Sequence, residues 1–218
     1  VLGRATAADL ASTVRCAYDP AARGAVEQLA DSGLGSLDWP EAAPVAAKEE
    51  WDCYRHDGAV SVSWAWHEAP RQQVPHDVLA RLVSPGRYPK RVAWLWTPYS
   101  AGEAARIVEH QRNVVQFRQH YSRVKGKDET ARDVEDRQRA TQAAHEEAAG
   151  AGVGLVNLFV TTTVTEEAEL PKAVADIESA ADASKIRLRR CWAGQAAAFA
   201  TTLPAGVMPR TTSTHWPH

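Results

Sequence analysis

The sequence predicts an α+β fold, and three observations lead to this prediction. Residues 59–67 alternate between apolar and small or polar side chains, which is typical of a β-strand. Residues 155–192 follow a strand–helix–strand pattern, and residues 101–149 are helical in pattern. We therefore expect a ferredoxin-like layered sheet, mixed or antiparallel and with helices on one face. We also expect a long helical hairpin inserted between two strands of this fold, and an N-terminal helical arm before the sheet.

Helical patterns open the chain. The first predicted helix covers residues 5–18, with Thr6 as a suitable N-cap and Asp19-Pro20 at its end. A second, shorter helix follows over residues 21–33. These two segments together predict an N-terminal helical lobe or arm.

Three regions follow from this pattern. We expect an N-terminal helical arm over residues 1–48, of which residues 34–48 are a loop rich in Gly, Pro and Ala. An α+β domain is predicted over residues 49–206, and a tail over residues 207–218. No internal repeat interrupts this order.

Two strands of a hairpin are predicted within residues 51–67, because Asp57-Gly58 is a favourable turn dipeptide. The second strand places one set of side chains on one face and a smaller set on the other: Val60, Val62, Trp64 and Trp66 against Ser61, Ser63 and Ala65. After a helical turn near residues 78–83, a further strand is predicted over residues 91–99.

The predicted hairpin, about residues 101–149, consists of two helices. Residues 102–124 form an amphipathic helix, and Lys125-Gly126-Lys127 breaks it. Residues 128–149 are also helical in pattern, but their face is mostly charge and alanine. Such a face is usually solvated, and in a scaffold it can serve as a docking surface.

The strongest strand pattern of the chain lies at residues 155–165. An amphipathic helix over 166–182 and a strand over 185–192 follow it. The next run, GQAAAFATTLPAG at 194–206, predicts a short helix that covers the sheet edge and ends at Pro204 and Gly206.

The composition is that of an ordinary globular protein, with 44% hydrophobic residues and a net charge of −2 at pH 7. A protein that grips phosphates usually has a basic surplus, so this charge argues against nucleic-acid binding. Three cysteines at irregular spacing do not form a disulfide framework, which favours a reducing compartment. No apolar run approaches the roughly 18 residues of a membrane span, so we expect this chain itself to be soluble.

The sequence lacks the phosphate-binding pattern of a motor ATPase, G-x-x-x-x-G-K-[ST] between a strand and a helix. The glycines at 150–154 precede a strand, and residues 124–128 lack the first glycine and the hydroxyl. We therefore expect no ATPase activity in this chain.

Cys53 and His56 are the nearest approach to a catalytic motif. They suit a Cys–His nucleophile or half of a zinc site, but no second Cys/His pair of suitable spacing follows. We favour the interpretation in which Trp51 and Tyr54 pack and the other side chains of this strand and turn are solvated.

Three further groups of residues are weaker candidates for a site. His110 and His120 are nearly three helical turns apart, too far for one metal ion. The threonines at 161–163 are better explained by β-propensity on a half-exposed strand than by ligand binding. A basic cluster comprises Arg187, Arg189 and Arg190. It can contact phosphate, an acidic partner or lipid headgroups, or it can be the solvated face of a strand. The sequence thus assigns no catalytic, cofactor-binding or metal-ligating residue.

An ordered string of elements in the C-terminal third resembles the N-terminal, non-motor domain of TraC-type conjugative type IV secretion ATPases. The matching elements are Val160–Thr165, Glu166–Leu170, Ala173–Glu178, Arg187–Arg190, Gln195–Phe199 and Leu203–Gly206. The middle of the chain, with WDCYRHDGAVSVSWAW and VAWLWTP, is similar to actinobacterial conjugal-transfer membrane proteins. The resemblance covers about residues 50–206 and includes no catalytic signature.

This resemblance implies a non-catalytic scaffold domain of a conjugative DNA-transfer apparatus, without a cofactor or metal. Its implied partners are the motor ATPase and other subunits, with a second copy of itself as a further possibility. The implied location is the cytoplasmic face of the membrane, with anchoring by segments outside this chain. Two alternatives remain open: a small enzyme with a Cys53/His56 site, and a weak single-stranded DNA-binding module.

Overall fold

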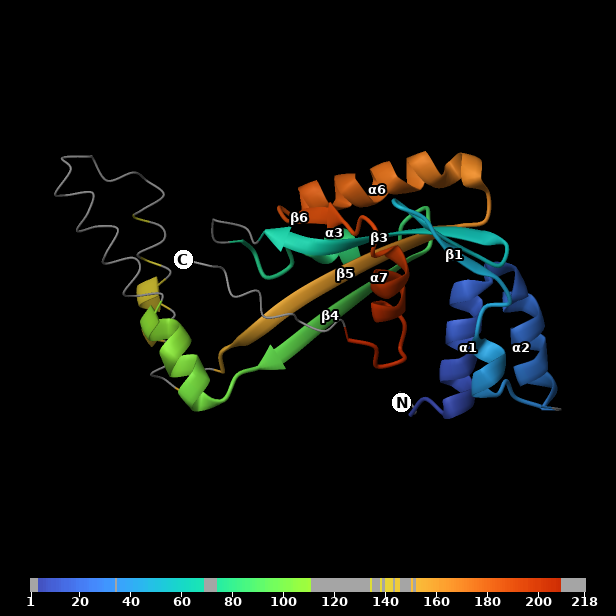
Figure 1. Ribbon diagram of the computed structural model, residues 1–218, viewed down its shortest axis with the longest axis horizontal. Helices are drawn as coiled ribbons and strands as arrows, with labels where there is room; N and C mark the ends of the chain where they lie inside the picture. The colour runs from blue at the N-terminus through green and yellow to red at the C-terminus, as the bar shows by residue number, and fades with distance from the viewer. Residues whose placement is uncertain are drawn as a thin grey trace. The chain divides into compact units, whose positions relative to one another are not determined.

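The computed structural model describes residues 4–33, 35–68, 74–110 and 152–208, with residues 134, 138, 140–142, 144–145 and 150 (Figure 1). The chain divides into two compact units. The first unit comprises Val1–Pro70, Pro75–Ala93 and Leu158–His218; the second comprises Arg71–Val74 and Trp94–Asn157.

The prediction of an α+β fold is confirmed, and its sheet is antiparallel. Six strands form it: β1 (Ala47–Glu49), β2 (Tyr54–His56), β3 (Ala59–Glu68), β4 (Lys90–Pro98), β5 (Gly154–Val164) and β6 (Arg187–Arg190). The order is β1-β2-β3-β5-β4, and β6 also pairs with β3. Because β5 pairs with β3 from Val60 to Ala65, the strands β2 and β6 must follow one another along the opposite edge of β3.

The main helices are α1 (Ala7–Tyr18), α2 (Arg23–Ser32), α3 (Ala80–Val83), α6 (Leu170–Ala183) and α7 (Gln195–Thr201). Short 3-10 turns lie at Pro20–Ala22, Trp39–Ala42 and Glu167–Glu169. Thr6 caps α1 as predicted and forms a capping box with Asp9. The expected loop over 34–48 was only partly right, because it contains the 3-10 turn at Trp39–Ala42 and most of β1.

The predicted hairpin at 101–149 falls mostly outside the described residues. Residues 101–110 are helical, as are the separate described residues from 134 to 145. Within the second unit, Ala104 and Val108 are buried on one helix face, as their spacing of one turn predicts. No helix in the described ranges is both long and apolar enough to cross a bilayer.

The turn of the β2–β3 hairpin lies at Asp57-Gly58 as predicted, and Asp57 has a φ of 45°. Its Oδ1 accepts hydrogen bonds from the backbone N–H groups of Val45 (2.9 Å) and Ala46 (3.0 Å). Its Oδ2 lies 3.1 Å from a guanidinium nitrogen of Arg15 on α1. These contacts compensate for an unfavourable backbone conformation and fix the N-terminal helix to the hairpin.

One face of the sheet packs against α6 and α3. The fully buried side chains of the core between them include Val62 and Trp64 on β3, Val160 on β5, and Ile177 on α6. The apolar alternation of β3 therefore faces this core, as its sequence pattern predicts. Trp66 continues the same face and is partly buried against the cluster.

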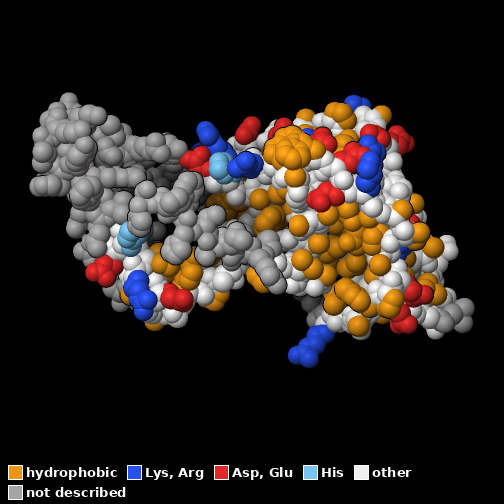
Figure 2. Space-filling model, viewed as in Figure 1, with side chains coloured by type: hydrophobic (Ala, Val, Ile, Leu, Met, Phe, Trp, Pro, Cys, Tyr) orange, Lys and Arg blue, Asp and Glu red, His pale blue; other side chains and the backbone are white. Residues whose placement is uncertain are grey.

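The opposite face is also covered, so the expectation of helices on one face only was wrong. Figure 1 shows α7 on the side of the sheet away from α6. Phe199 and Leu203 form a second buried cluster with Ala11 and Val14 of α1 and with Tyr54. They thus cover a sheet face rather than its edge. Figure 2 shows hydrophobic side chains gathered over this part of the surface.

Candidate interaction site at the end of strands β3 and β6

Cys53 and His56 do not form a pair. Both are buried, with 4% and 1% of their surface exposed, so the expectation of solvated side chains was wrong. Successive side chains of a strand alternate between faces, and residues three apart therefore point in opposite directions. Cys53 belongs to the core beneath α6, whereas the His56 ring lies 4.7 Å from that of Phe199 in the other cluster.

The Cys53 thiol is poorly suited to nucleophilic attack or metal binding. Burial, together with a hydrogen bond to Glu50, raises its pKa to about 11. Its ligand atom and those of Glu50 and Asp52 lie within 4.8 Å of one another. However, the Glu50 carboxylate already engages Lys48 and Arg55, each at 3.1 Å. The closeness of Glu50, Asp52 and Cys53 is therefore explained by an ion-pair network at the start of β2, without a metal ion.

His56 instead starts a buried chain of hydrogen bonds. The Tyr18 carbonyl can only accept, so Nδ1–H of His56 donates to it at 2.5 Å. Nε2 then accepts from the Ser61 hydroxyl at 2.7 Å, and Ser61 in turn accepts from Thr163 at 2.7 Å. Burial lowers the pKa of His56, which keeps the ring neutral as this chain requires.

The threonines of β5 are buried as well, Thr161 and Thr163 in the same layer as Ser61 and Thr162 on the opposite face of the sheet. Thr161, Thr162 and Thr163 are at most 3% exposed, which corrects the expectation of a half-exposed strand. Thr161 bonds Ser63 at 2.8 Å and Thr202 at 3.0 Å. Thr163 bonds Ser61 within the sheet, and Thr162 donates to the carbonyl of Pro89 at 2.9 Å. Each of the three hydroxyls therefore already has a partner within the chain.

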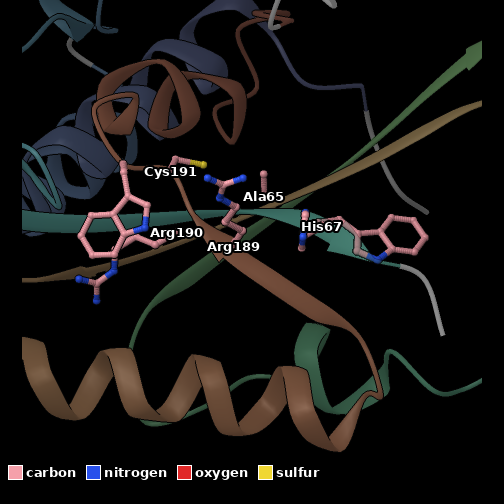
Figure 3. A pocket seen from close by; sticks show the side chains of 7 residues that line it. Ala65, His67, Arg189, Arg190 and Cys191 are labelled. Carbon is pink, nitrogen blue, oxygen red and sulfur yellow. The ribbon is translucent and has the colours of Figure 1, made fainter. Parts of the chain in front are cut away.

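An accessible cavity of about 230 Å³ lies at the end of β3 and β6. It is lined by Ala65, Trp66, His67, Arg189, Arg190, Cys191 and Trp192. Figure 3 shows the side chains of Arg189 and Cys191 on the same side of the sheet as Ala65. The register explains this, because Ala65 pairs directly with Arg189.

A β-bulge places His67 at the rim of this cavity. Trp66 pairs with Leu188 and Glu68 with Arg187, so His67 is an extra residue on β3 without a partner on β6. A bulge bends its strand and redirects the extra side chain. The sequence pattern gave no sign of it, because the apolar alternation already ends at Trp66.

The arginines of the basic cluster differ in their surroundings. Arg187 lies 3.4 Å from Glu68, and Arg190 lies 3.6 Å from Asp52. The guanidinium of Arg190 also stacks over Trp64 and Trp192, at 5.7 and 5.2 Å from the ring centroids. Within the described part of the chain, no carboxylate forms an ion pair with Arg189. The cavity therefore offers one guanidinium without a described ion-pair partner, and an exposed imidazole also lines it.

Two exposed tryptophans flank the site. Trp192 is 47% exposed and Trp51 is 68% exposed. The loops that carry them are joined, because the N–H of Ala193 donates to the carbonyl of Trp51 at 2.8 Å. Large exposed aromatic rings on a well-ordered framework are typical of interaction surfaces.

Neither of the two predicted histidines is among the residues that line the cavity. His110 is exposed at the end of the described helix in the second unit, and His120 lies outside the described residues. Comparison of the chain with family models, curated proteins and solved structures gave no match.

We expect Cys53 and Cys191 to react slowly with a maleimide in the folded protein. Burial raises both thiol pKa values from 9.0 to about 11. At about pH 8 this change lowers the thiolate fraction roughly 100-fold. Labelling followed by mass spectrometry should show rates that rise with pH in native buffer and are fast in urea. Rapid native labelling of Cys191 at about pH 8 would contradict this account of its environment.

Proposed function

We propose that this chain is a non-catalytic scaffold domain of a conjugative, type IV secretion-like DNA-transfer apparatus. Its partners in this proposal are the motor ATPase and other subunits at the cytoplasmic face of the membrane, with anchoring by segments outside the printed sequence. The observation that carries the interaction role is the pair of exposed tryptophans, Trp51 and Trp192, on adjoining loops. Such rings are frequent binding hot spots because they bury much apolar area at low entropic cost.

The conjugative setting is supported by the resemblance of residues 160–206 to the non-motor domain of TraC-type ATPases. We also propose a ferredoxin-like arrangement, since the connectivity β3-α3-β4-β5-α6-β6 is that of a β-α-β-β-α-β unit. The strand order β6-β3-β5-β4 accommodates both crossovers within one antiparallel sheet. In this arrangement the predicted hairpin replaces the short connection between β4 and β5.

The enzyme alternative has little support in the geometry, because Cys53 and His56 lie in different clusters. The DNA-binding alternative would need a sheet face on which bases can stack. The central part of the face opposite α6 lies under α7, where Ser61, Ser63 and Thr161 are fully buried. A protein partner is therefore the better-supported proposal.

The proposal is tested by co-expression with the motor ATPase encoded on the same genetic element. Size-exclusion chromatography with light scattering, with and without nucleotide, should reveal a stable complex. The double variant Trp51→Ala/Trp192→Ala should weaken that complex by roughly tenfold or more. Trp39→Ala is the matched control, because Trp39 is also half exposed, at 53%, but lies on a separate 3-10 turn. A monomer under every condition would refute the proposed motor contact.

A further inference from the structure

We propose that the cavity beside the β-bulge and the free edge of β6 dock an extended, acidic segment of a partner protein. The inference deepens the scaffold role proposed above and rests on it for biological meaning. Its physical basis is independent of the identity of the partner. It joins three features of one region: an open strand edge, an uncompensated positive charge and an aromatic wall.

The open edge belongs to β6, which pairs only with β3 in the described part of the chain. An unpaired strand edge presents backbone donors and acceptors that can accept another strand. Strand addition gives affinity through the main chain, and the alternating side chains of the added strand provide specificity. The occupant is therefore expected to be extended rather than helical.

The charge pattern of β6 indicates an acidic occupant. Arg187 and Arg189 are exposed and two residues apart, so they project from the same face of the strand. An added strand with carboxylates at alternate positions places one opposite each guanidinium. The existing pair of Arg187 with Glu68 spans 3.4 Å, and the Arg187 side chain is 77% exposed. An ion pair so exposed contributes little and is readily exchanged for another.

The cavity adds a second, more enclosed position for a carboxylate. Arg189 and His67 enter it from neighbouring strands, and the bulge brings the extra residue of β3 to this end of the sheet. Burial keeps the Cys191 thiol protonated by raising its pKa to about 11, so no thiolate competes for the guanidinium. An acidic side chain in this position meets one cation and one imidazole that can donate a hydrogen bond.

Aromatic side chains form the walls of the cavity. The ring of Trp192 is held by the stacked guanidinium of Arg190, whose other ring contact is the fully buried Trp64. Trp66 lines the other part of the cavity and packs partly against the core. These walls suit the apolar residues that alternate with carboxylates in an extended segment. A fixed aromatic wall also lowers the entropic cost of binding.

The test is a titration of the isotope-labelled protein with an acidic peptide, followed by NMR. The peptide has about eight residues, a length typical of strands, with glutamate alternating with threonine or valine. We expect shifts confined to β6 and the residues that line the cavity, with saturation below about 1 mM. Arg189→Glu should weaken binding roughly tenfold or more. Arg81→Glu, at an exposed arginine on α3, should leave it unchanged.

Two further arms keep the result interpretable. A peptide with lysine in place of glutamate should bind the Arg189→Glu variant better than the unmodified protein, which rules out simple misfolding of that variant. No binding of the acidic peptide at about 1 mM, or binding unaffected by Arg189→Glu, would overturn the inference. Tighter binding of an oligothymidylate at the same residues would also overturn it, in favour of nucleic acid. Because the motor ATPase is absent from these titrations, their failure is distinct from failure of the scaffold proposal.

Discussion

Replacing Phe199 with alanine should lower the free energy of unfolding by about 3–5 kcal/mol, the usual range for a buried aromatic residue. Phe199 is fully buried, and its ring lies between 4.7 and 5.3 Å from those of Tyr18, Tyr54 and His56. It therefore joins three parts of the chain that are distant in sequence: α1, β2 and α7. Alanine leaves a cavity that these rings cannot close without moving one of the elements.

A neighbouring cation increases the expected loss. The guanidinium of Arg91 lies 4.6 Å from the centre of the Phe199 ring, and burial lowers the Arg91 pKa to about 10. One of its nitrogens has no hydrogen-bond partner. Removal of the ring takes away one of the favourable contacts of a poorly solvated charge, whose Nε also donates to Thr202 at 3.5 Å.

Urea denaturation of the two proteins measures this effect directly, and Phe199→Leu is the matched control. Leucine keeps most of the apolar volume, so it should cost clearly less than alanine. Hydrogen exchange adds a regional readout, because α1 depends on Phe199 through Tyr18. We expect α1 to lose protection before β3 and β5 in the alanine variant. A loss of less than about 1 kcal/mol would mean that the cluster does not hold α1 to the sheet.

The strands were predictable because their side chains alternate. The β2–β3 hairpin follows from the dipeptide Asp57-Gly58, and β5 follows from its β-branched and apolar pattern. The burial of the second face was not predictable in this way. Serine and threonine at alternate positions are typical of a solvated face, yet here Ser61 bonds Thr163 and Ser63 bonds Thr161, and all four are buried. Hydrogen bonding between strands distant in sequence leaves no local signal.

The candidate site was predictable only in its composition. The sequence indicates a basic cluster near residue 190 and several tryptophans, but its pattern does not distinguish the three arginines from one another. Their difference depends on the partners that the fold brings together: Asp52 and Trp192 for Arg190, but no described carboxylate for Arg189. The position of His67 likewise depends on a bulge, and a bulge is a property of the register between two strands.

Replacing Gln195 with alanine should lower the free energy of unfolding by about 1–3 kcal/mol, because it leaves the buried N–H of Ser63 without its partner. The carbonyls of Ser63 and Cys191 still accept from the N–H groups of Cys191 and Gly194. β2 pairs with β3 up to Ser61 and β6 begins at Trp64, so the backbone of Ser63 lies between the two paired segments. The Gln195 side chain occupies this place. Its Oε1 accepts from the N–H of Ser63 at 2.7 Å, and its Nε2 donates to the carbonyls of Ser63 (3.2 Å) and Cys191 (2.9 Å).

The amide of Gln195 thus acts as a substitute for a strand, and only a group that both donates and accepts can do so. Gln195→Glu should therefore be at least as destabilising as alanine, since a buried carboxylate would face two carbonyl oxygens. Gln28→Ala is the matched control, because Gln28 is exposed on α2 and its loss should change stability by less than about 0.5 kcal/mol. Chemical denaturation gives the magnitude, and faster hydrogen exchange at the Ser63 amide locates the cause. Unchanged exchange at Ser63 in the alanine variant would mean that another group replaces the amide of Gln195.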